Sequence, residues 1–206
     1  MNAKGAAILL DPHPCGHIVY PYTDEGLVGQ AVALFASAGL RDGEGVVLIM
    51  SSNHYEPIKV RLQVEGIDTE AYERSGQLSC VTSEDLIAKF ITDGVLDEDL
   101  FKFTVSRLID QTRASVSNGH RGKVRVFGEM VSQLREKNLQ ATTLLEELWN
   151  QVIKEQSVAL LCTYALHNAE DHIPRALMDL HSHNIERESN AQSAVHSSTF
   201  GRERLR

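Results

Sequence analysis

Two long apolar runs, VVLIM at 46–50 and VALLCTYAL at 158–166, constrain the fold of this 206-residue chain more than any other feature. A strand whose side chains are apolar on both faces has to be covered on both faces, which is typical of the inner strands of a parallel sheet. Further strand-like segments occur at 17–22, 75–83 and 123–131. Apolar residues recur with helical spacing between the strands, at 25–38, 55–65, 83–92, 100–118, 141–156 and 173–183.

Strands that alternate with helices need crossover connections, which favour parallel pairing with helices on both faces of the sheet. We therefore expect an α/β fold with three layers, α/β/α, around a mostly parallel central sheet. A single domain is predicted over residues 16–188. A lead-in at 1–15 precedes it, and a polar, flexible tail at 189–206, rich in Ser, Asn, Gln and Arg, follows it.

Charge and composition exclude several classes of protein. The net charge of −8 repels polyanions and no basic patch dominates, so we expect no direct contact with nucleic acid. The chain shows no apolar run long enough for a bilayer and no signal-peptide pattern at its start. Three widely spaced cysteines argue against a disulfide framework. A cytoplasmic protein is the expected class.

The segment GHIVYPYTDEGLVGQAVALF at 16–35 has the strand–turn–helix layout of a phosphate-binding loop. Such a loop needs glycines for its backbone amides, a lysine for the phosphates and Ser or Thr for magnesium. The turn here lacks the glycines and the lysine, and Asp24 and Glu25 would repel phosphates. A strand-end acid, Glu129, could hold magnesium, but without the loop the metal would have no nucleotide to bind. We expect no enzymatic activity and no cofactor.

Ligands of open parallel sheets bind beyond the carboxyl ends of the strands. A pocket at that edge, with tyrosines, a carboxylate and a histidine, suits a small and partly apolar molecule. The alternative for each residue is that it ends a strand and packs in the core. The predicted ligand-binding residues are Tyr20, Tyr22, Thr23, Glu129, Met130, Tyr164 and His167.

Metal and nucleophilic sites have weaker support. HPCGH at 13–17 and HSH at 181–183 supply imidazoles and a thiol, but neither has the spacing common in zinc sites. Cys162 lies in an apolar strand and is expected to be a core residue. Glu146 and Glu147 are adjacent on one helix and point in different directions, so a solvated helix face is the simpler interpretation. We predict no metal site and no catalytic residue.

The order of several motifs resembles the MEDS family, a sensory domain named for methanogens and methylotrophs. The resemblance covers residues 16–183 and rests on GHIVYPYTD, AGLRDGE, SGQLS, DGVLDEDL, GKVRVFGEM, LLEELWN, ALLCTY and LHSHN, in that order. It implies a bacterial or archaeal protein with a RecA/KaiC-like fold that lacks a functional P-loop. The residues that it marks as characteristic are His17, Tyr22, Glu129, Glu147, Asn150, Cys162, Tyr164 and His181. Members often carry a tryptophan shortly after Gly-Glu-Met, where this chain has Val131, Ser132 and Gln133.

The resemblance also implies a function. Family members are proposed to sense small hydrocarbon derivatives and to signal to a DNA-binding or histidine-kinase module. We therefore expect a non-enzymatic sensor that binds a small organic molecule and signals to a histidine kinase or transcription-regulator partner. Two alternatives stay open: a residual nucleotide-binding or ATPase domain, and a protein-interaction module without a small ligand, for instance a homodimer.

Overall fold

A six-stranded parallel sheet forms the centre of the molecule. The computed structural model describes residues 1–116, 122–135, 137–168 and 170–186. Neighbouring strands follow the order β3-β2-β6-β7-β1-β8, and every pair of neighbours is parallel. Their bounds are β1 (His17–Tyr22), β2 (Gly45–Met50), β3 (Leu78–Thr82), β6 (Val124–Gly128), β7 (Ala159–Ala165) and β8 (His183–Asn184). This sheet confirms the predicted α/β fold.

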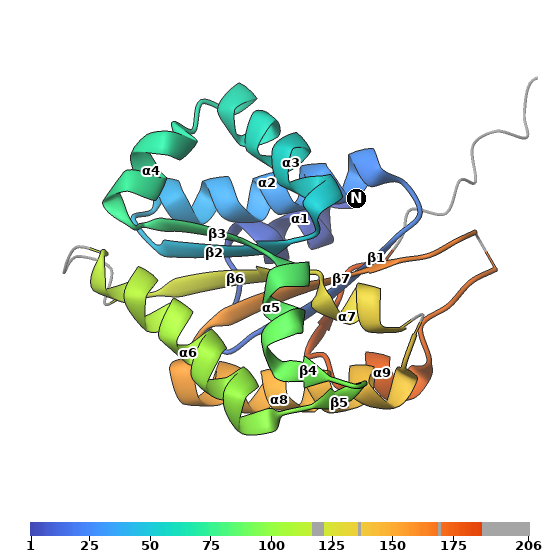
Figure 1. Ribbon diagram of the computed structural model, residues 1–206. Helices are drawn as coiled ribbons and strands as arrows, with labels where there is room; N and C mark the ends of the chain where they lie inside the picture. Colours follow the sequence, from blue (N-terminus) through green and yellow to red (C-terminus); the bar gives the residue numbers. More distant parts are fainter. Residues whose placement is uncertain (117–121, 136, 169, 187–206) are drawn as a thin grey trace, which may run out of the picture.

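Helices cover both faces of the sheet (Figure 1). One layer holds α1 (Ala3–Leu10), α2 (Glu25–Arg41), α3 (Ser52–Val64) and α4 (Thr69–Ser75). The other holds α5 (Ser83–Phe90), α6 (Glu98–Ala114), α7 (Met130–Arg135), α8 (Leu139–Gln156) and α9 (Arg175–Met178). A short antiparallel hairpin, β4 (Ile91–Thr92) and β5 (Val95–Leu96), connects α5 to α6.

Alternation along the strands divides the core into two. Ile18 and Tyr20 of β1 pack into the core under α1–α4, whereas Val19 between them packs into the core under α5–α9. Successive side chains of a strand point to opposite faces, so both faces of an inner strand must be apolar. The apolar runs recognised in the sequence are β2 and β7, and all six residues of β2 are buried.

The structure differs from the predicted elements at both ends of the chain and between them. The strand predicted at 123–131 ends at Gly128 and is followed by α7, and neither α7 nor α4 was predicted. The lead-in contains α1, whose Leu9 is fully buried. The buried Arg125 donates to the carbonyls of Leu9 and Leu10 and so ties α1 to the sheet. The helix predicted at 83–92 ends at Phe90, where the hairpin begins. The helix predicted at 173–183 is only the single turn of α9.

Part of the prediction concerns residues outside the described ones, namely the end of the helix at 118 and the tail at 189–206. Over the residues that the structure does describe, no helix combines the length and the apolar character needed to cross a membrane.

Candidate functional site

The turn after β1 presents carboxylates where a phosphate loop would present amides. Asp24 is the N-cap of α2, and its Oδ1 accepts hydrogen bonds from the backbone N–H groups of Gly26 (2.7 Å) and Leu27 (3.2 Å). These are the free amides of a helix N-terminus, which attract anions. A phosphate would have to displace the Asp24 carboxylate to reach them, because the turn already satisfies these amides of its own helix.

His54 links two further acids at the carboxyl ends of the parallel strands, Glu25 and Glu129. Its Nδ1 donates to Glu129 at the end of β6, and its Nε2 donates to Glu25 at the start of α2. Glu129 is buried and also accepts the Ser51 N–H at 2.6 Å. The hydrogen bond to Glu129 is the largest cause that raises the pKa of His54 to about 9, against the opposing effect of burial. His54 is thus an imidazolium between two carboxylates at neutral pH.

We call Glu25, His54 and Glu129 the bridge. Tyr22 lies beside it, with its ring centroid 6.3 Å from that of His54. Burial raises the pKa of the Tyr22 hydroxyl, and the Glu129 and Glu25 charges raise it further. Tyr22 therefore stays a neutral phenol that borders the bridge.

A groove of about 450 Å³ opens between α5, the β4–β5 hairpin, α7 and the start of α8. Its apolar wall is formed by Ile87, Ala88, Ile91, Leu134 and Ala141. Polar groups stand along it as well, namely Glu84, Gln133, Lys137 and Asn138. An apolar wall with a few polar groups is the usual composition of a small-molecule site.

The groove is connected to the bridge through the start of α3. The Gln133 Nε2 donates to Glu84 Oε1 at 3.1 Å, and Glu84 accepts the Ser52 N–H at 3.2 Å. The preceding residue, Ser51, is the one whose N–H binds Glu129. The first amides of α3 are therefore held by one carboxylate from the groove and one from the bridge.

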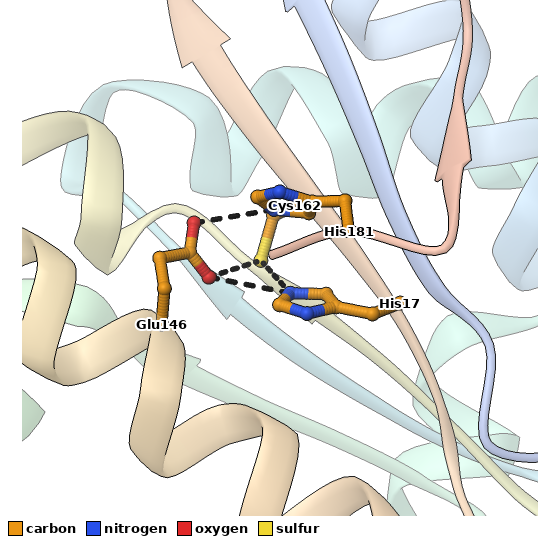
Figure 2. Close-up of side chains that lie close together, drawn as sticks. All are labelled: His17, Glu146, Cys162 and His181. Carbon is orange, nitrogen blue, oxygen red and sulfur yellow. Dashed lines mark hydrogen bonds and ion pairs between the residues drawn. The ribbon is translucent and has the colours of Figure 1, made fainter. Parts of the chain in front are cut away.

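A second group of polar side chains is buried within the layer under α8 (Figure 2). His17 opens β1, Cys162 lies in β7, Glu146 is on α8, and His181 precedes β8. Burial alone would raise the pKa of Glu146, but the neighbouring imidazoles of His17 and His181 outweigh that effect and lower it to about 2. We call these four residues the buried cluster.

The sequence matches one family, the methanogen/methylotroph, DcmR sensory domain (MEDS), over residues 16–182. That match covers most of the chain. The protein belongs to the MEDS family. No curated protein matches it.

Among solved structures, a KaiC-like protein from the hyperthermophilic archaeon Pyrococcus horikoshii OT3 is similar to this MEDS domain, with a TM-score of 0.51 and 14% sequence identity. The similar region covers 80% of this chain and 66% of that chain. At this identity the likeness concerns the fold alone, and it confirms the KaiC-like architecture expected from the sequence.

The predicted ligand-binding residues do not meet in one place. Tyr20 and Tyr22 point into the core under α1–α4, whereas Met130 and Tyr164 point into the core on the other side of the sheet. Thr23 and His167 are exposed in loops. Of the seven residues, Tyr22 and Glu129 lie together beside His54. A ligand-binding role for these residues stays a prediction.

Five of the eight family-characteristic residues, His17, Asn150, Cys162, Tyr164 and His181, gather at the buried cluster of the MEDS domain. His17, Cys162 and His181 belong to it, and Asn150 accepts a hydrogen bond from His17 at 3.1 Å. Glu147 is exposed. The expected solvated face of α8 is wrong for Glu146, which is fully buried. Polar partners from β1, β7 and the segment before β8 compensate for its lost hydration.

Several residues of both sites escaped prediction. The carboxyl-edge rule selects residues 51–54 after the second strand, but His54 is not among the predicted ligand-binding residues because a lone histidine early in a helix carries no motif. Its signal is positional, since it follows the inner strand β2 at the carboxyl edge, like Glu129 after β6. Glu84 and Gln133 had a similar signal, as each follows a strand end by two to five residues.

Proposed function

We propose that this MEDS domain is a non-enzymatic sensor whose ligand is a small organic molecule of the hydrocarbon-derivative class. The ligand binds in the groove between α5, α7 and α8, and its partner is a histidine kinase or a transcription regulator. The observation that carries the proposal is the groove itself, which joins an apolar wall to a few hydrogen-bonding groups. Its volume of about 450 Å³ lies in the range of about 300–1,000 Å³ of small-molecule pockets.

The position of the groove agrees with the family resemblance. Gln133 and Leu134 line it, close to where other members often carry a tryptophan. A glutamine there leaves more space than an indole and offers an amide for hydrogen bonding. The preferred ligand has an apolar body and one or two polar atoms, such as a short alcohol, aldehyde or amide.

A route for the signal follows from the contacts of Glu84. A ligand that takes the hydrogen bond of Gln133 or Glu84 competes with the Ser52 N–H at the start of α3. Release of this amide would loosen the turn that carries His54 and so weaken the bridge to Glu25. A ligand changes signalling only if it prefers one of two conformations. Here the two conformations are a closed one, in which His54 binds Glu25, and an open one, in which that contact is broken.

The test is a thermal-shift screen against short alcohols, aldehydes, amides and halogenated hydrocarbons, with Mg-ATP included. A ligand at a hundred times its Kd adds about 2.7 kcal/mol, which raises the Tm of a domain of this size by roughly 5–10 °C. The same screen is run on Ala88→Trp, which fills the groove from its exposed wall, and on Ala7→Trp, a matched change on an exposed face of α1.

We expect an organic compound to raise the Tm of the wild type and of Ala7→Trp but not of Ala88→Trp. A shift that persists in Ala88→Trp would place the ligand elsewhere. A shift with Mg-ATP instead would favour the nucleotide-binding alternative, and no shift with any compound would favour the interaction module.

A further inference from the structure

The buried cluster brings four potential metal ligands to one point from four separate elements (Figure 2). They are His17 Nε2, a carboxylate oxygen of Glu146, Cys162 Sγ and His181 Nε2, all within 4.8 Å of one another. The side chains of Glu146 and His181 are fully inaccessible to solvent, and His17 and Cys162 are buried as well. Such a concentration of polar atoms in a core needs a compensating interaction.

Four distances between the ligand atoms are close to the edges of a tetrahedral site. Zinc lies about 2.0–2.1 Å from nitrogen or oxygen and about 2.3 Å from sulfur, so the edges of a zinc tetrahedron are about 3.3 Å between N and O and about 3.6 Å to sulfur. Glu146 Oε2 lies 3.2 Å from His17 Nε2, and Glu146 Oε1 lies 3.3 Å from His181 Nε2. Cys162 Sγ lies 3.4 Å from His17 Nε2 and 3.8 Å from Glu146.

Hydrogen bonds outside the cluster aim the lone pairs of both imidazoles inward. The Asn150 Nδ2 group donates a hydrogen bond to the Leu180 carbonyl at 3.0 Å. The Asn150 Oδ1 atom therefore faces His17 Nδ1 and accepts a hydrogen bond from it. His181 Nδ1 donates to the Leu177 carbonyl at 2.9 Å. A neutral imidazole with its proton on Nδ1 carries a lone pair on Nε2, and metal-binding histidines are oriented in this way.

Two more observations favour a cation at this site. His181 Nε2 is buried and makes no hydrogen bond within the described residues. The Tyr164 hydroxyl donates a hydrogen bond to Glu146 Oε1, which fixes the orientation of the carboxylate toward the cluster. A divalent ion would also neutralise the carboxylate and a Cys162 thiolate together, which leaves the buried site without net charge.

We propose that the buried cluster of His17, Glu146, Cys162 and His181 binds a divalent transition-metal ion, with zinc as the best fit to this mixed nitrogen, sulfur and oxygen set. Binding displaces the Cys162 thiol proton to solvent and forms one metal–sulfur bond. The ion ties α8 and the segment before β8 to strands β1 and β7. Its role is structural, because four protein ligands complete a tetrahedron.

The test begins with protein that has been treated with a chelator and then titrated with Zn²⁺ or Co²⁺. We expect one ion per chain by elemental analysis, a zinc-dependent rise in Tm, and a cobalt spectrum with the intense visible bands of tetrahedral coordination and a thiolate-to-cobalt charge-transfer band. Cys162→Ser should abolish the charge-transfer band and weaken zinc binding about 10- to 100-fold or more.

Matched variants separate this site from others. Cys15→Ser and Cys80→Ser remove the exposed and half-buried thiols and should leave the cobalt spectrum unchanged. Glu146→Gln preserves the shape of the side chain and keeps the test valid if Cys162→Ser does not fold. It should weaken zinc binding while the charge-transfer band remains. Loss of the band in Cys15→Ser, an octahedral cobalt spectrum, or a folded wild type that binds no zinc and shows no change in Tm would each overturn the proposal.

Discussion

Deprotonation of His54 is expected to destabilise the domain. The pKa of this imidazole is about 9 in the folded protein, against about 6.5 for a histidine in an unfolded chain. The folded state therefore binds the proton more tightly, and the resulting stabilisation is fully present below about pH 6.5. It is lost as the pH rises through about 9, because the neutral ring can donate to only one of its two carboxylate partners, Glu129 and Glu25.

The structure sets the size of this effect. A rise of the pKa from about 6.5 to about 9 corresponds to roughly 3 kcal/mol at about 1.36 kcal/mol for each pKa unit. Two facts reduce this figure. The Glu25 side chain is 68% exposed, so solvent screens its half of the bridge, and His54 itself retains some contact with water. We expect about 1–2 kcal/mol, or about 2–8 °C in Tm.

The assay is thermal or urea unfolding of the wild type and of His54→Gln between about pH 6 and about pH 10. Other groups titrate over this range in both proteins, so only the difference between them is informative. His172→Gln serves as the control, because His172 is exposed and lies outside the bridge. The wild type should be more stable than His54→Gln at about pH 6 and lose that advantage by about pH 10. A difference that stays constant or grows with pH would refute the reasoning.

Four further substitutions test the helices and the packing around the sheet. Gly29→Ala should stabilise α2 by about 0.5–1 kcal/mol, because the added Cβ meets open space. Gly39→Ala in the same helix should be destabilising, because its Cβ would lie 2.8 Å from the Arg125 side chain. Urea unfolding of each variant measures the change in the free energy of unfolding. Arg125→Met should cost about 3–5 kcal/mol in the same assay, because the Glu44 carboxylate near the core loses its buried partner and keeps the exposed Lys123, 3.8 Å away. Asp24→Ala should lower the free energy of unfolding by about 1 kcal/mol through loss of the α2 cap, measured by the shift in Tm.

The layers of the fold could be predicted because they follow from local patterns. β2 and β7 are apolar on both faces and have to be inner strands of a covered sheet, and α2 and α8 are long enough for their helical period to show. β8 has two residues and therefore no period. It exists because its backbone pairs with β1 at Ile18 and Val19, an interaction between distant parts of the chain.

The sites could be predicted only in part, for a related reason. The carboxyl-edge rule correctly placed Glu129 at the end of β6, but it could not show that His54 neutralises it. The rule also ignores which face a side chain takes, so it grouped Tyr22 with Tyr164 although the sheet separates them. Glu146 and Glu147 are equivalent in the sequence, and only the packing of α8 decides which of the two is buried.

The carboxyl edge shows why loss of one residue would not restore a phosphate site in this MEDS domain. Removing Asp24 frees two amides at the start of α2, but Glu25 still stands at the same helix end and Glu129 faces it across His54. The imidazolium is already engaged by both carboxylates, so it offers no free charge to a phosphate. An anion would have to disrupt the cap and the bridge together. The carboxylates Glu129 and Glu84 at this edge also hold the amides of Ser51 and Ser52 at the start of α3, so a change that displaces one of them affects the helix as well.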